Sequence, residues 1–185
     1  MALRIIPILL ALIISFNATS ISISKANAET FSLWPLSETA PSHVLAVWIN
    51  INKLLITIAE ENLEDKAKIT RIKSLTLSKV EGKIPREVLG QVNKFRIVLD
   101  QNRLFHRLSP SSNSRDLSTK AMQPRTVFIN SLLVLDSLQE WELIVYGNEI
   151  SFAPYYRFDI RENIEPSDVF SQVVLATKRL ELLIQ

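Results

Sequence analysis

Apolar side chains recur at helical spacing in four segments of the chain, and each segment starts with a proline. The segments open at Pro41, Pro85, Pro124 and Pro166, and each reads proline, two polar residues, valine, then leucine or phenylalanine. Proline suits the first position of a helix, because its missing N–H would have no partner there. The pattern predicts four repeat units with a helix beginning near each of these prolines.

The apolar positions of the four segments align with one another when they are counted from the proline. Steps of three and four residues place them on one stripe of each helix. We call these positions the seam: Val44, Trp48, Ile51 and Leu55; Val88, Val92, Phe95 and Leu99; Val127, Ser131, Val134 and Leu138; Val169, Val173, Ala176 and Leu180. Ser131 is its polar exception. The predicted fold is mainly α, with the seams facing one another in a bundle or a short helical array.

The connectors between the four segments are about 20 residues long, more than the two to eight that an up-and-down bundle needs. Such lengths could return along a whole helix, hold a short helix or an extended piece, or form a functional loop. Residues 66–83 of the first connector interleave lysine and arginine with isoleucine and leucine. One interpretation is a peripheral contact with an anionic membrane or an acidic partner. The alternative is an edge strand or short helix with a solvated lysine face.

Aromatic residues gather in the third connector beside arginine. Tyr155, Tyr156, Arg157 and Phe158 follow one another there. Aromatic and arginine side chains are enriched in recognition surfaces, so these residues are a candidate recognition surface. The alternative is a lid that covers the helical core. Upstream, Gly147-Asn148 favours a turn between short extended pieces.

The first residues of the chain have the three-part layout of a secretory signal. Arg4 precedes an apolar run from Ile5 to Phe16, and Ala26-Asn27-Ala28 offers a cleavage site. We therefore expect residues 1–28 to be a signal peptide and residues 29–185 to form a single helical domain in the periplasm or outside the cell. An uncleaved segment that anchors the chain in a membrane is the alternative.

Charge and cysteine content exclude several classes of function. The chain carries 21 basic and 19 acidic residues, and residues 1–28 contain Arg4, Lys25 and no acid. The predicted domain is therefore balanced in charge and lacks the basic surface that nucleic acid requires. Because the chain has no cysteine, it has no disulfide and no thiolate metal site.

No catalytic, cofactor or metal motif occurs in the sequence. The three glycines are scattered, and His43 and His106 stand without a matching carboxylate cluster. We therefore expect an exported, non-catalytic interaction module whose repeated helices form a scaffold and whose connectors contact a protein or a small ligand. One alternative is a carrier that holds an apolar small ligand or lipid between its helices, and another is an enzyme without a recognisable motif.

Overall fold

The computed structural model describes residues 38–110, 123–147 and 150–185, and all of them belong to one compact unit that spans Trp34 to Gln185. The predicted signal peptide therefore lies outside the described residues. The helices are α1 (Pro41–Asn62), α2 (Lys66–Ser74), α3 (Pro85–Phe105), α4 (Pro124–Tyr146) and α5 (Pro166–Ile184), with a short 3-10 helix, η2 (Ala153–Tyr156). The prediction of a mainly α fold is confirmed, and the described residues contain no strand.

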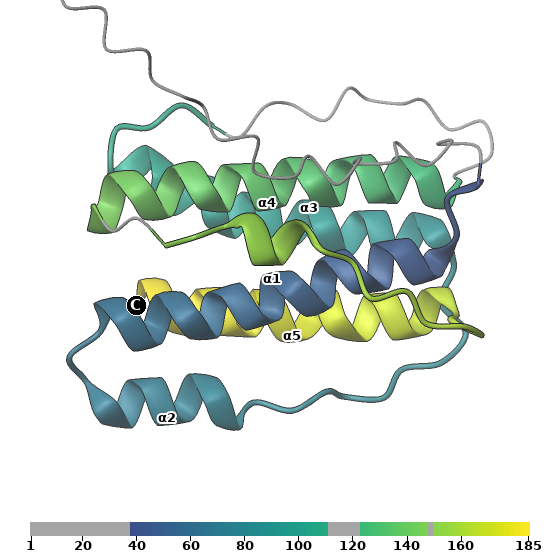
Figure 1. The fold of residues 1–185 in the computed structure, drawn as a ribbon, viewed down its shortest axis with the longest axis horizontal. Helices are drawn as coiled ribbons and strands as arrows, with labels where there is room; N and C mark the ends of the chain where they lie inside the picture. Colours follow the sequence, from purple (N-terminus) through teal and green to yellow (C-terminus); the bar gives the residue numbers. More distant parts are fainter. Residues whose placement is uncertain (1–37, 111–122, 148–149) are drawn as a thin grey trace, which may run out of the picture. The chain divides into compact units, whose positions relative to one another are not determined.

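The four long helices run parallel to one another, with their N-termini at the same end (Figure 1). Their first prolines and the valines three residues further on line one small cavity at that end: Pro41, Val44, Pro85, Val88, Pro124, Val127, Pro166 and Val169. Because consecutive long helices start at the same end, each connector has to return along the bundle. The unusual length of the connectors follows from this topology.

Contacts between the helices define their order around the bundle. Helices α1 and α3 each pack against both α4 and α5, and the α3–α4 interface is the least extensive of the four. The order around the axis is therefore α1, α5, α3, α4. The long helices α1 and α3, which follow one another in the chain apart from the short α2, lie across the axis from each other. Helices α4 and α5 do the same.

All sixteen seam positions are buried, and none exposes more than 2% of its surface. The apolar seam residues all belong to one core cluster, so the prediction that the seams face a shared core is confirmed. Ser131 is fully buried, and its Oγ accepts a hydrogen bond of 2.8 Å from Trp48 Nε1. The same hydroxyl donates to the Val127 carbonyl oxygen at 2.8 Å. The polar exception in the seam therefore satisfies the buried indole N–H.

Helix α1 is the most apolar element of the bundle. By length and composition it could cross a membrane, yet 72% of its most apolar window is buried by the rest of the protein. It packs against α5, α4, α2 and η2. A helix covered by neighbours on several sides has to be apolar on several sides, so its place in the core accounts for its hydropathy.

The first connector holds helix α2, so residues 66–74 form a short helix and not the edge strand that the sequence also allowed. Asp65 caps this helix, because its carboxylate accepts hydrogen bonds from the backbone N–H groups of Ala67 at 2.9 Å and Lys68 at 3.1 Å. Ile72 faces the core and is fully buried. Residues 75–84 then return to the start of α3 without pairing as a strand.

A buried arginine of α5 holds α2 against the bundle. The Arg179 guanidinium donates to the carbonyl oxygens of Ile72 at 3.3 Å and Leu75 at 3.1 Å. It also donates to Asn52 Oδ1 of α1 at 2.9 Å. Because the last carbonyls of a helix lack partners within the helix, Arg179 acts as a C-terminal cap for α2.

Candidate functional site

The predicted recognition residues pack against α1 and α4. The Tyr155 hydroxyl donates to Thr57 Oγ1 at 2.9 Å, and the Tyr156 hydroxyl bonds to Asp136 Oδ1. The Phe158 ring meets Phe128 edge-on, with 6.1 Å between centroids. All three aromatic side chains are half-buried against the core. The three rings therefore make contacts with both α1 and α4.

Asn50 of α1 fixes the backbone of the same connector. Its side chain is buried, and its Nδ2 donates to the carbonyl oxygens of Tyr155 at 3.0 Å and Arg157 at 2.8 Å. The Arg157 side chain itself is exposed. Sequence reasoning missed Asn50, although an asparagine inside the apolar run VWININKLL is a signal that a buried polar partner is needed.

The third connector begins at Gly147, which ends α4. Its φ of 68° lies in the left-handed region that glycine adopts without steric cost, and its N–H donates to the Leu143 carbonyl oxygen at 3.0 Å. The predicted turn at Gly147-Asn148 continues beyond the described residues, because 148–149 are not among them. On the described sides of this turn the expected extended pieces are not assigned as strands: α4 continues to Tyr146, and residues 150–152 have no regular secondary structure before η2 begins.

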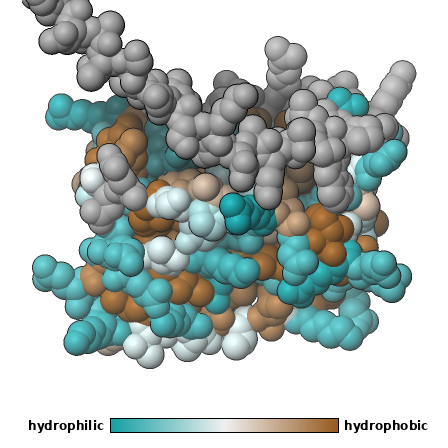
Figure 2. Space-filling view, viewed as in Figure 1, coloured by the Kyte–Doolittle hydropathy of each residue, from teal (hydrophilic) through white to brown (hydrophobic). Residues whose placement is uncertain are grey.

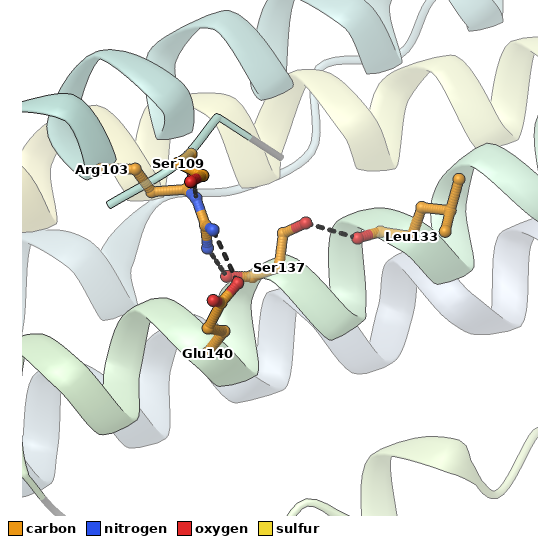
Figure 3. Close-up of polar contacts among 5 residues, drawn as sticks. All are labelled: Arg103, Ser109, Leu133, Ser137 and Glu140. Carbon is orange, nitrogen blue, oxygen red and sulfur yellow. Dashed lines mark hydrogen bonds and ion pairs between the residues drawn. The ribbon is translucent and has the colours of Figure 1, made fainter. Parts of the chain in front are cut away.

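A groove of about 340 Å³ lies between α4 and the end of α3. Figure 3 shows the polar contacts inside it. Its lining residues are Arg103, Ser109, Pro110, Leu133, Asp136, Ser137 and Glu140. The volume is at the lower end of the range of about 300 to 1,000 Å³ that small-ligand sites occupy. The groove is therefore large enough to receive a side chain or a small molecule.

Arg103 forms the floor of this groove (Figure 3). Its guanidinium exposes only 2% of its surface and donates to Ser109 O at 3.0 Å, Ser137 O at 2.9 Å and Glu140 Oε2 at 2.6 Å. The Ser137 hydroxyl in turn donates to the Leu133 carbonyl oxygen at 2.8 Å. Arg103 thereby ties the end of α3 to α4 and holds one carboxylate in a fixed position at the rim.

Two carboxylates stand at the rim of the groove on α4. The Glu140 side chain is 57% exposed, and Asp136 is also exposed. Burial and the Asp136 carboxylate raise the pKa of Tyr156 well above its usual range, so the phenol remains a hydrogen-bond donor to Asp136. The groove and the predicted recognition surface therefore share the Tyr156–Asp136 contact. Among the described residues that line the groove, two carboxylates and one guanidinium leave an excess of negative charge.

Large apolar side chains of α3 and α4 project into solvent. Ile97 and Leu104 of α3 are each 57% exposed, Phe105 is 81% exposed, and Ile144 of α4 is 51% exposed. Figure 2 shows apolar and polar side chains interspersed on one face of the molecule. None of these four residues belongs to the seam, and sequence reasoning gave them no role. The sequence could have identified them as apolar residues on helix faces that do not carry the seam.

A second buried acid lies near the C-terminal end of α4. Glu142 is fully buried, and neither of its carboxylate oxygens accepts a hydrogen bond of normal geometry among the described residues. Burial raises the pKa of this carboxyl, and the Asn62 side chain opposes the shift only in part. Burial, followed by the Glu142 charge, raises the pKa of Tyr146. Glu142 therefore favours the protonated form inside the fold.

The raised pKa of Glu142 predicts that stability falls as pH rises. The folded state binds this proton more tightly than the unfolded state does. The contribution of Glu142 to the free energy of unfolding is therefore complete below the pKa of the unfolded state and is lost as pH rises through the pKa of the folded state. Glu142→Gln is expected to remove this decline and to be more stable at neutral pH by about 1 kcal/mol. Urea unfolding between pH 4 and 8 measures both effects. The exposed Glu181→Gln on α5 is the control, and parallel curves for wild type and Glu142→Gln would contradict the prediction.

The two histidines lie at helix ends. His43 sits in the first turn of α1, where its Nδ1 accepts the Ala40 N–H at 3.0 Å. His106 is the exposed residue that follows α3. Among the described residues, no group of three or more histidine or carboxylate side chains is placed to hold a metal ion.

No protein-family model, curated protein or solved structure matches this chain.

Proposed function

We propose that this chain is an exported, non-catalytic helical-repeat protein that binds a protein partner. The observation that carries the proposal is the set of exposed apolar side chains on α3 and α4, two helices that pack against each other. Ile97, Leu104, Phe105 and Ile144 each expose more than half of their surface. Large apolar side chains exposed on neighbouring helices are typical of a surface that a partner covers.

We further infer that the four long helices derive from copies of one unit. The prolines and valines at equal positions of the four units line the same cavity. Seam residues at equal distances from the prolines are buried to the same extent. Equal sequence positions in equal environments are the expected outcome of duplication.

A carrier of an apolar ligand has less support. The cavity on the axis measures about 20 Å³, and about one water molecule fills such a space. Around the axis, Trp48, Phe95 and Trp141 are fully buried and occupy the interior. An acyl chain would enter this part of the bundle only if the helices separated.

Peripheral membrane contact through residues 66–83 also has less support. Several of its lysines pair with acids: Lys73 with Glu60, Lys79 with Glu81, and Lys83 with Glu87. Ion pairing reduces the positive field that would attract anionic lipid. We therefore assign binding to the groove between α3 and α4 in preference to this segment.

Export is tested by the N-terminus of the mature protein. We expect N-terminal sequencing of protein recovered from an exporting bacterial host to begin at Glu29, because Ala26 and Ala28 are the small residues that signal peptidase requires. An Ala28→Leu variant is expected to accumulate as precursor. Recovery of wild type with Met1 retained in the membrane fraction would contradict cleavage and favour an anchor.

Binding is tested by site-specific photo-crosslinking in cells. A photoreactive phenylalanine analogue at position 105 replaces the most exposed of the apolar side chains, and the same analogue at the exposed Glu181 of α5 is the matched control. We expect a discrete protein adduct at position 105 and none at position 181. An absence of adducts at both positions, or equal adducts at both, would count against the proposed function.

A further inference from the structure

We propose that the groove between α3 and α4 recognises a basic amphipathic segment of a protein partner. In this arrangement a lysine or arginine of the partner reaches Asp136 and Glu140, and apolar residues of the same segment cover Leu133 and Ile144. The inference rests on the proposed function and names the chemistry of the partner.

The residues that carry this inference form one stripe of α4. Leu133, Ser137, Glu140 and Ile144 follow one another at steps of four, three and four residues, so they share one face of the helix. Leu133, Ser137 and Glu140 line the groove, and Ile144 lies one turn further along. The stripe is therefore polar at its centre and apolar at both ends, as the complement of an amphipathic segment has to be.

The acidic centre is held in place before a partner arrives. Arg103 binds Glu140 through Oε2, and Tyr156 binds Asp136 through Oδ1. The second oxygen of each carboxylate remains open to a donor from solvent, since Glu140 is 57% exposed and Asp136 is exposed. Fixed carboxylates lose little conformational entropy on binding. Their excess over the single guanidinium favours a cation.

The apolar flanks exclude other occupants. Ile144 is 51% exposed and Leu133 is half-buried at the groove, and a partner that covers them gains apolar burial that a free metal ion or polyamine would not provide. The carboxylates repel phosphate, so nucleic acid and anionic lipid headgroups are poor occupants. A peptide that carries both apolar side chains and a positive charge satisfies both parts of the surface.

A pair of synthetic peptides tests this chemistry. One is an amphipathic helix of leucine and lysine, and the other has glutamate at every lysine position. Fluorescence anisotropy with the full-length exported protein is expected to show at least tenfold tighter binding of the lysine peptide. The double variant Asp136→Asn with Glu140→Gln is expected to weaken that binding about tenfold and to reduce its salt dependence. The double variant Glu162→Gln with Glu181→Gln removes two other exposed carboxylates; it is the charge-matched control and is expected to bind as wild type does.

A second variant keeps the test independent of folding. Ile144→Ser removes an exposed apolar side chain, and it is expected to weaken binding severalfold with an unchanged unfolding curve. Equal affinity for the two peptides would overturn the inference, as would unchanged binding in the Asp136→Asn and Glu140→Gln variant. Binding to phosphatidylcholine vesicles that depends on Ile144 would also overturn it, because a membrane would then be the occupant.

The inference and the proposed function fail in different ways. A protein adduct at position 105 without any preference for the lysine peptide overturns the basic partner and leaves the binding module intact. No adduct at position 105, together with no preference between the peptides, would contradict both the inference and the proposed function.

Discussion

Leu138→Ala and Leu180→Ala are each expected to destabilise the bundle by about 2 to 5 kcal/mol. Both leucines are fully buried in the core cluster, each fourteen residues after the proline of its segment. Truncation removes apolar contacts and leaves a cavity, because four tightly packed helices cannot close inward around the missing atoms. Urea unfolding followed by circular dichroism gives the change in the free energy of unfolding.

Leu143→Ala is the matched control for this prediction. Leu143 lies on the same helix as Leu138 but is 50% exposed. Its truncation is expected to change the free energy of unfolding by no more than about 0.5 kcal/mol. Losses near zero at both Leu138 and Leu180, or a loss at Leu143 as large as theirs, would contradict the shared core.

The seam could be predicted because its information is local. A helix has a fixed period, so apolar residues at steps of three and four reveal which face is buried without any knowledge of the neighbouring helix. The same pattern contains no information on the direction of the helix. The parallel arrangement was therefore not predicted, although the length of the connectors was consistent with a return along the bundle.

Buried polar residues escaped prediction because their partners are distant in sequence. Asn50 bonds with the connector near residue 155, and Arg103 reaches Ser137 and Glu140. In a helix seen alone, each of these side chains is equally consistent with a solvated face. The groove was missed for the same reason, since it forms only when α3 and α4 come together. The cluster at Tyr155 to Phe158 was located, but its burial depends on α1 and α4.

The parallel topology brings the positive ends of four helix dipoles together, and acidic residues in the first turns offset their repulsion. Four helix N-termini, each the positive end of a helix dipole, meet at one end of the bundle. Glu87 and Asp168 lie in the first turns of α3 and α5 and accept the backbone N–H groups of Ile84 at 3.1 Å and Glu165 at 2.9 Å. Hydrogen bonding to Lys83 and Ile84 lowers the pKa of Glu87. Its negative charge therefore persists where it offsets the dipole.

Arg179 is a buried polar side chain that joins three helices. Arg179→Leu is expected to lower the free energy of unfolding by about 2 to 4 kcal/mol. The substitution leaves carbonyl oxygens of Ile72 and Leu75 and the Asn52 side chain without their donor. Leucine fills part of the volume, so the loss comes mainly from unpaired acceptors. Burial also lowers the pKa of Arg179, and relief from that desolvation keeps the cost below the sum of its hydrogen bonds.

The effect of Arg179→Leu is expected to be concentrated on α2, because this arginine caps that helix. Amide hydrogen exchange of residues 66–75 is expected to accelerate far more than exchange in the seam of α1. The neighbouring Lys178 is exposed, and Lys178→Leu is the control, with a change of no more than about 0.5 kcal/mol. Unchanged exchange in α2 would mean that the apolar contact of Ile72, buried among the seams, suffices to hold the first connector on the bundle.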